Sequence, residues 1–246
     1  MELSPKPLWI AALVMTLGAC AAAPVDSPYT ESGVLLALSG GDAGADAACH
    51  TCHGLKGEGD GDLVPRLAGL DRGYLARQLI LFAQGQRRHE QMQWIARHFD
   101  PSEQDRVAEY YAQLAWPQEG RPAPSPARCG APDGMAAARL YREGDAGRGL
   151  AACATCHGAA GEGVGAGNPP LAGQPAPYIA EQLRKWREGE RYGDALGAMR
   201  DAARALAEEE IAPLAAFAAS LSGLPDDPVS PAECLPPRRP DPRNGA

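Results

Sequence analysis

The sequence predicts an all-α protein made of two tandem copies of one helical domain. The chain matches itself over a long span when it is shifted by 104 residues, so that Cys49 falls on Cys153 and Tyr74 falls on Tyr178. A self-match at a fixed period indicates an internal duplication. Within each copy the apolar residues recur at helical spacing, and no segment alternates between apolar and polar residues as a half-buried strand does.

Each copy is expected to contain three main helices. The first precedes a Cys pair and covers residues 34–38 in one copy and 135–141 in the other. The middle helix carries a buried stripe that runs from Leu75 to Phe82 at intervals of three to four residues. The last helix begins at Pro101, which is followed by Ser and Glu in a sequence typical of a helix N-terminus.

The repeat and the composition between its copies divide the chain into six segments. We expect a lipoprotein-type signal peptide at 1–19, a tether at 20–32, a first domain at 33–116, a proline-rich linker at 117–128, a second domain at 129–234 and a polar tail at 235–246.

The N-terminal segment indicates export. Residues 8–19 form an apolar run of signal-peptide length that ends at Leu17-Gly18-Ala19-Cys20. This ending resembles a bacterial lipobox, in which the Cys becomes the lipidated first residue. Ordinary cleavage after a small residue, with Cys20 discarded, is the alternative. We therefore expect a periplasmic protein, anchored to the membrane through Cys20 if that residue is lipidated.

The composition indicates a large buried cofactor. Leu, Ile, Val and Phe together make up only 40 of the 246 residues, and the net charge is −8. Such values are typical of chains that cannot form a core from side chains alone, so part of the buried volume must come from another source. The excess of 31 acidic over 23 basic residues argues against nucleic-acid binding.

The motif Cys-x-x-Cys-His occurs at equivalent positions of the two copies. It comprises Cys49, Cys52 and His53 in the first copy and Cys153, Cys156 and His157 in the second. Two thiols one helical turn apart can bond to the two vinyl groups of a porphyrin, and the adjoining His then binds the iron. A redox dithiol or a zinc site built from four Cys are the alternatives, but neither requires a His directly after each pair. The sequence therefore predicts two covalently bound haem c groups.

The sixth iron ligand is predicted to be a methionine in both copies. Met92 and Met199 occupy equivalent repeat positions, on what reads as the loop before the last helix. This pairing outweighs the usual role of Met as a filler of apolar cores. His89 and His98 are rival ligands for the first haem. Met135 has no Met counterpart and is expected in the core.

Together these motifs resemble the two-haem class I c-type cytochromes of the cytochrome c4 type. The shared pattern is Cys-x-x-Cys-His-Gly, Pro-x-Leu-Ala-Gly, Tyr-x-x-x-Gln-Leu and Met-x-x-x-Ala, and it covers nearly the whole mature chain in two copies. The resemblance implies two tandem class I cytochrome c domains that face each other about a pseudo-twofold axis. It also implies that the carbonyls of Pro65 and Pro169, each 12 residues after its His, orient the ligating imidazoles.

Two further cysteines, Cys129 and Cys234, are also repeat equivalents. In an oxidising compartment, with a pseudo-twofold axis between the domains, we expect them to form a disulfide. Two free thiols, or one Cys serving as a haem ligand, are the alternatives.

The function expected from these features is that of a periplasmic electron carrier without substrate chemistry. The resemblance implies respiratory partners: a terminal oxidase as acceptor, or a bc-type complex as donor. The alternatives are a two-haem oxidoreductase of the thiosulfate dehydrogenase or peroxidase type, and the cytochrome subunit of a periplasmic dehydrogenase. The basic cluster 87–89 is expected to be a solvated loop, or else to flank the first haem edge.

Overall fold

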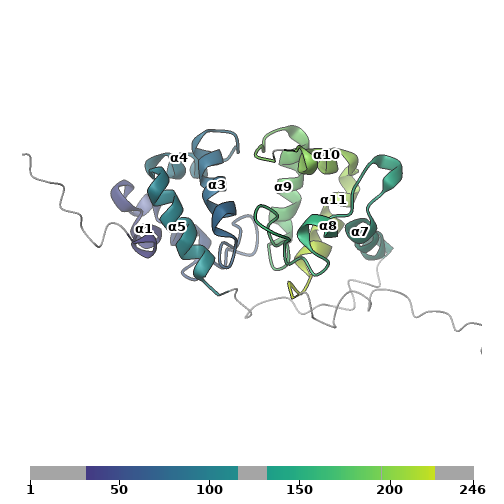
Figure 1. Cartoon of the computed structure of the whole chain (residues 1–246), viewed down its shortest axis with the longest axis horizontal. Helices are drawn as coiled ribbons and strands as arrows, with labels where there is room; N and C mark the ends of the chain where they lie inside the picture. The colour runs from purple at the N-terminus through teal and green to yellow at the C-terminus, as the bar shows by residue number, and fades with distance from the viewer. Residues whose placement is uncertain (1–31, 116–131, 195, 225–246) are drawn as a thin grey trace, which may run out of the picture.

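The protein consists of two helical halves that lie side by side (Figure 1). The structure, a computed structural model, describes residues 32–115, 132–194 and 196–224. Within these ranges there is no named strand, and the only β pairing consists of two isolated bridges. The all-α prediction is confirmed. The signal peptide, Cys20, the linker 117–128, Cys129, Cys234 and the tail 235–246 lie outside the described residues.

The first half contains a core of four helices and one short helical turn. Its helices are α1 (Gly33–Ser39), α2 (His50–His53), α3 (Arg72–Ala83), α4 (Glu90–His98) and α5 (Pro101–Gln113). Helix α3 packs against α4 and α5, and α1 packs against α5. Their apolar faces enclose one core, which includes Leu36, Leu75, Ile95, Val107 and Tyr111.

The second half repeats this arrangement. Its helices are α7 (Pro132–Glu143), α8 (Ala154–His157), α9 (Ala176–Glu188), α10 (Ala198–Ala205) and α11 (Glu208–Ala219). Helix α11 packs against α7 and α9, and α9 packs against α10. The corresponding core includes Tyr141, Ile179, Leu183, Ile211 and Leu214. The middle helices α3 and α9 lie on the inner sides, where the two halves meet (Figure 1).

Side-chain caps set the starts of several helices. Asp100 accepts hydrogen bonds from the backbone N–H groups of Ser102 and Glu103, while the Glu103 carboxylate accepts one from the Asp100 N–H. This reciprocal capping box satisfies donors that would otherwise lack partners, and Pro101 fits the first position because it has no N–H to satisfy. Asp71 caps α3 in a similar way.

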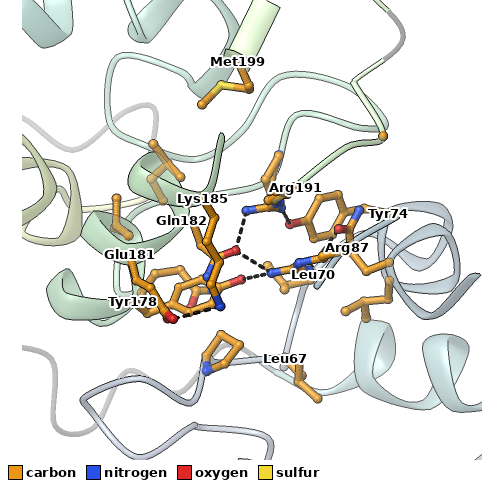
Figure 2. Close-up of a pocket in the computed structure, with 18 of the residues that line it drawn as sticks. Leu67, Leu70, Tyr74, Arg87, Tyr178, Glu181, Gln182, Lys185, Arg191 and Met199 are labelled. Carbon is orange, nitrogen blue, oxygen red and sulfur yellow. Dashed lines mark hydrogen bonds and ion pairs between the residues drawn. The ribbon is translucent and has the colours of Figure 1, made fainter. Parts of the chain in front are cut away.

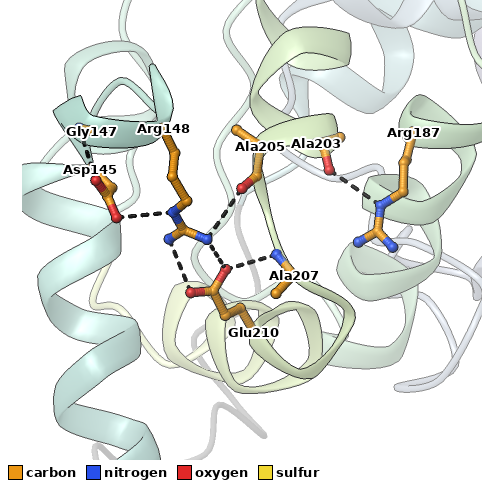
Figure 3. A network of polar contacts seen from close by, with 8 residues as sticks. All are labelled: Asp145, Gly147, Arg148, Arg187, Ala203, Ala205, Ala207 and Glu210. Atoms are coloured by element: carbon orange, nitrogen blue, oxygen red, sulfur yellow. Dashed lines mark hydrogen bonds and ion pairs between the residues drawn. The ribbon is translucent and has the colours of Figure 1, made fainter.

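An arginine-centred network holds α10 and α11 together in the second half (Figure 3). Arg148 forms ion pairs with Asp145 at 2.9 Å and with Glu210 at 2.8 Å, and also donates to the carbonyl of Ala205 at 3.2 Å. Ala205 is the last residue of α10 and Glu210 lies in the first turn of α11, so one guanidinium fixes the angle between the two helices.

Two expectations about methionines are wrong. Met135 is 44% exposed, because the buried stripe of α7 runs through residues 137, 138, 140 and 141 and leaves position 135 on the solvent side. Met92 and Met199 lie not in loops but in the first turns of α4 and α10. No helix in the described ranges is long and apolar enough to cross a membrane.

Candidate haem-binding site

Each Cys-x-x-Cys-His motif forms one turn of helix that buries its histidine. In the first half the His53 N–H donates to the Cys49 carbonyl at 2.9 Å. In the second, the His157 N–H donates to the Cys153 carbonyl at 2.9 Å. Both imidazoles are only 7% exposed. The turn therefore brings two thiols and a buried imidazole to the same side of the backbone in each half.

A proline carbonyl orients each imidazole. Nδ1 of His53 lies 2.9 Å from the carbonyl oxygen of Pro65, and Nδ1 of His157 lies 2.8 Å from that of Pro169. Burial lowers the pKa of both histidines, which favours the neutral ring. In the neutral form Nδ1–H donates to the proline carbonyl, so Nε2 keeps its lone pair for a metal.

The chain folds tightly over each histidine to place that proline. The Gly59 N–H donates to the His53 carbonyl at 2.8 Å. Gly59 adopts φ +79°, and a Cβ at this position would lie 2.5 Å from the carbonyl oxygen of Val64. Only glycine combines this left-handed conformation with so close an approach. Gly163 does the same in the second half, with a bond of 2.7 Å to the His157 carbonyl.

Both candidate methionine ligands are held by a cap on their own backbone. The Met92 N–H donates to Nδ1 of His89 at 3.3 Å, and the Met199 N–H donates to the Asp194 carboxylate. The rival ligand His89 lines the same cavity as Met92, but its Nδ1 serves as this cap. The other rival, His98, is exposed and does not line the cavity.

All eight predicted ligand and attachment residues line one continuous cavity of about 430 Å³ that spans the two halves. They are Cys49, Cys52, His53 and Met92 from the first half, and Cys153, Cys156, His157 and Met199 from the second. Pro65 and Pro169 also line it. Each half thus offers a thiol pair, an oriented imidazole and a thioether around one mostly apolar space, which is the donor set that a covalently attached haem requires.

The four motif cysteines are not arranged as a zinc site. Among the described residues, no group of three His, Cys, Asp or Glu side chains is close enough to hold a metal ion. Burial raises the pKa of the Cys49 and Cys153 thiols to about 11, which disfavours the thiolate that a zinc ligand or a redox dithiol needs. The structure favours haem attachment over both alternatives.

Contacts that were not predicted from the sequence join the two halves across the cavity. Arg87 is 6% exposed and not solvated as expected. It donates to Gln78 of its own half at 2.9 Å, and to Tyr178 at 2.8 Å and Gln182 at 2.9 Å of the other half (Figure 2). The solvated-loop expectation is correct only for Arg88 and His89. The repeat could have indicated that Arg87 has a structural role, since Arg191 occupies the equivalent position at the shift of 104.

Further contacts connect the halves on either side of this pair. The backbones of the two halves pair at an isolated bridge between Arg87 and Arg191. There the Arg88 N–H donates to the Glu190 carbonyl and the Tyr192 N–H donates to the Gln86 carbonyl, both at 3.0 Å. Elsewhere the Gln174 amide exchanges two hydrogen bonds with the backbone of Arg66, at 2.9 and 3.1 Å. The two halves are therefore held in one fixed arrangement.

Fold and site together define a c-type cytochrome with two haem-binding domains, and comparisons with known proteins agree. Residues 142–222 match the family model of cytochrome c. The chain is 39% identical over 216 residues to a thiosulfate dehydrogenase electron acceptor of Stutzerimonas stutzeri, which covers 86% of this chain and 92% of the relative. It is 35% identical over 190 residues to cytochrome c4 of Thiocapsa roseopersicina, covering 74% and 91%. The chain belongs to the cytochrome c family, among the two-haem proteins related to cytochrome c4.

Solved structures show the same architecture. Cytochrome c4 from Pseudomonas stutzeri matches with a TM-score of 0.63 and 29% identity, over 70% of this chain and 93% of that one. A thiosulfate dehydrogenase from Marichromatium purpuratum matches with a TM-score of 0.67 and 40% identity. That match covers 78% of this chain but only 40% of the longer protein. The predicted two-domain cytochrome fold and the two covalently bound haem c groups are thereby confirmed.

Proposed function

We propose that this two-haem electron carrier accepts electrons from a thiosulfate dehydrogenase in the periplasm and passes them to a further redox partner. The observation that carries the proposal is the single cavity to which both halves contribute a thiol pair, a His and a Met. Two haems in one cavity suit a protein that takes up two electrons and releases them one at a time.

In this proposal both irons have two protein ligands, so that no position is left open for a substrate. His53 and Met92 would bind the first iron, and His157 and Met199 the second. When bound, each haem supplies a one-electron ferric/ferrous couple. The protein orients the imidazoles through Pro65 and Pro169 and fixes the methionines at the starts of α4 and α10. A peroxidase would require one open iron, which a Met in both halves disfavours.

The choice of donor comes from the relatives. Two proteins named thiosulfate dehydrogenase electron acceptor, from Stutzerimonas stutzeri and Thiomonas intermedia, are 39% and 38% identical to this chain. The cytochromes c4 found in the same comparison are 31–35% identical. The difference favours a dehydrogenase over the bc-type complex as donor and leaves a terminal oxidase as a suitable acceptor.

Location follows from the leader. The apolar run at 8–19 and the lipobox-like ending at Cys20 support export and membrane anchoring through a lipidated Cys20. Covalent haem attachment takes place outside the cytoplasm in bacteria, which agrees with this placement.

The test is the reduction of the purified, oxidised two-haem protein, followed by its visible absorption in a stopped-flow instrument. We expect reduction of both haems when thiosulfate and a purified thiosulfate dehydrogenase are added together, and none with thiosulfate alone. Reduction by thiosulfate alone would make the protein an enzyme. If the dehydrogenase cannot reduce the protein while a quinol-driven bc-type complex can, the donor assignment is wrong and a cytochrome c4 role replaces it.

A further inference from the structure

The segment before the second methionine is three residues longer than its counterpart in the first half. Met92 follows Arg87 by five positions, whereas Met199 follows the equivalent Arg191 by eight. Both segments start from the backbone bridge between the halves, in which Arg87 pairs with Arg191. The extra length therefore lies between the domain contact and the methionine.

This longer segment contacts the first half. The side chain of Arg77, on α3, donates to the carbonyl of Gly193. Gly193 adopts φ +109°, and a Cβ at this position would clash with Cδ1 of Leu81, a buried residue of the same helix. A residue with a Cβ would fit neither this backbone conformation nor this space. Position 193 is thus held by a hydrogen bond and by a packing contact that both come from the other half.

The next residue, Asp194, caps the helix that carries Met199. Helix α10 follows Gly197, which has no side chain that could accept from the N–H groups of the first turn. Instead the Asp194 carboxylate accepts hydrogen bonds from the N–H groups of Met199 and, at 3.3 Å, of Leu196. The carbonyl of Asp194 accepts one from the Gly197 N–H at 3.1 Å. A carboxylate at a helix N-terminus stabilises the first turn through its hydrogen bonds and its charge, so Asp194 fixes the backbone of Met199.

The first half differs at this point. The Met92 N–H donates to the ring of His89 at 3.3 Å. His89 directly follows Arg88, whose N–H donates to the Glu190 carbonyl in the bridge. The bridge is therefore common to both methionine segments, whereas the contacts at Gly193 are made with the second segment.

We infer that the first half positions the methionine ligand of the second iron, with Arg77 and Asp194 as the positioning residues. Arg77 holds the backbone at Gly193, which places the carboxylate of Asp194. That carboxylate in turn fixes the start of α10, where Met199 lies. The closure of the second iron thus depends on a side chain of the other domain. The inference rests on Met199 as an iron ligand, which is part of the proposed function, and not on the identity of the electron donor.

The test follows two signals of the haem-loaded protein: the far-red methionine-to-iron band of the oxidised form and the binding of carbon monoxide to the reduced form. Asp194→Ala removes the cap and should lower the band, by no more than half, and allow carbon monoxide to bind to one of the two haems. Asp194→Asn keeps an oxygen acceptor and should retain most of the band. Arg77→Ala should act in the same direction with a smaller loss. A change of charge alone would shift a potential but leave the methionine bound, so the band reports the position of the ligand.

Double variants identify the iron that is affected. Arg77→Ala added to Met199→Ala should cause no further loss of the band, because the ligand that Arg77 positions is already absent. Arg77→Ala added to Met92→Ala should lower the band below that of Met92→Ala alone. The single variant Met199→Ala tests the ligand assignment separately. An unchanged band in that variant would show that Met199 is not a ligand and would overturn the inference with it.

Two controls separate this effect from other losses. Arg72→Ala removes another arginine of α3, which pairs with Asp105 of its own half, and should leave the band unchanged. Gln174→Ala removes two hydrogen bonds elsewhere between the halves and should also leave it unchanged. If Gln174→Ala lowers the band as much as Arg77→Ala, the ligand responds to the domain contact in general and the inference is wrong.

The inference is also wrong if Asp194→Ala and Arg77→Ala both keep the full band and bind no carbon monoxide. Haem content and thermal midpoint are measured on each variant. Because the two residues lie in different halves, they give independent tests if one variant fails to fold.

Discussion

Nδ1 of His53 lies 2.9 Å from the carbonyl oxygen of Pro65, 12 residues further along the chain. The second half repeats the contact between His157 and Pro169 at 2.8 Å. Because the acceptor is a backbone carbonyl, the geometry depends on the path of the loop and only indirectly on the proline ring. Glycine at position 59 allows that path, since its N–H bonds to the His53 carbonyl.

This dependence predicts different effects for two substitutions in one loop. Pro65→Ala keeps the carbonyl and should lower the free energy of unfolding by about 0.4–1 kcal/mol, through the greater freedom of the unfolded chain. Gly59→Ala forces a side chain into the left-handed region and against Val64, and should cost about 1–3 kcal/mol. Urea unfolding of the haem-loaded variants, followed by haem absorbance, checks the order. Equal losses for the two variants would contradict the account of the loop.

A second prediction concerns two core positions at which one half has a tyrosine where the other half has an alanine. Tyr111 on α5 and Tyr141 on α7 are both buried, and their repeat counterparts are the buried residues Ala218 and Ala37. Each core thus has one tyrosine, but on different helices. Tyr111→Ala should lower the free energy of unfolding by about 3–5 kcal/mol, as expected for removal of a buried aromatic ring. Adding Ala37→Tyr should recover more than half of this loss, because it copies the second half.

The single variant Ala37→Tyr is the control for this exchange. It should be destabilising on its own, because Tyr111 already fills the space. A double variant whose loss equals the sum of the two single losses would show that the two positions do not share one space.

A third prediction follows from the pKa of Glu210. The hydrogen bond from Arg148 holds the pKa of this carboxyl below its ordinary value of 4.5. The deprotonated group therefore stabilises the folded state above pH 4.5, and that contribution is lost as the pH falls through the lower folded-state pKa. Glu210→Gln should lower the urea midpoint at neutral pH, and the gap to the unmodified protein should narrow in acid. Glu209→Gln, which changes an exposed neighbour that makes none of the contacts of Arg148, should show no such gap. A gap that persists or widens in acid would contradict the assignment.

A fourth prediction concerns the two methionines at helix starts. Met92→Ala and Met199→Ala should each remove about half of the far-red methionine-to-iron absorption band and allow carbon monoxide to bind to one ferrous haem. Met135→Ala is the natural control, because this methionine is 44% exposed and outside the cavity. If His89 were the ligand of the first iron, Met92→Ala would leave the band unchanged.

The sequence predicts the inside of each domain well because the duplication provides an independent comparison at every position. Cys49 or Met92 alone could fit a ligand pattern by chance. Cys153 and Met199 repeat the pattern in the second copy, which excludes that explanation. The helices follow from periodicity, and a starting residue such as Pro101 follows from its capping neighbours.

The contact between the domains was not predictable in the same way. Arginine is normally a surface residue, so Arg87 in a basic cluster indicates solvent exposure unless its partner is known. That partner, Arg191, is 104 residues away, and the contact depends on how two complete domains meet. The prediction that Met135 is buried was wrong for a related reason. A single methionine without a repeat counterpart indicates only the average preference of methionine for the core, and position 135 lies on the solvent-facing side of α7.

The claim on which the rest depends is that both irons are closed by a His and a Met. The most direct measurement is the absorption spectrum of the purified, oxidised protein, followed by addition of carbon monoxide to the reduced form. The account predicts a far-red methionine-to-iron band of the size expected for two haems and no binding of carbon monoxide. A band that accounts for only one haem, or ready binding of carbon monoxide, would contradict it and would make one iron a site for substrate chemistry.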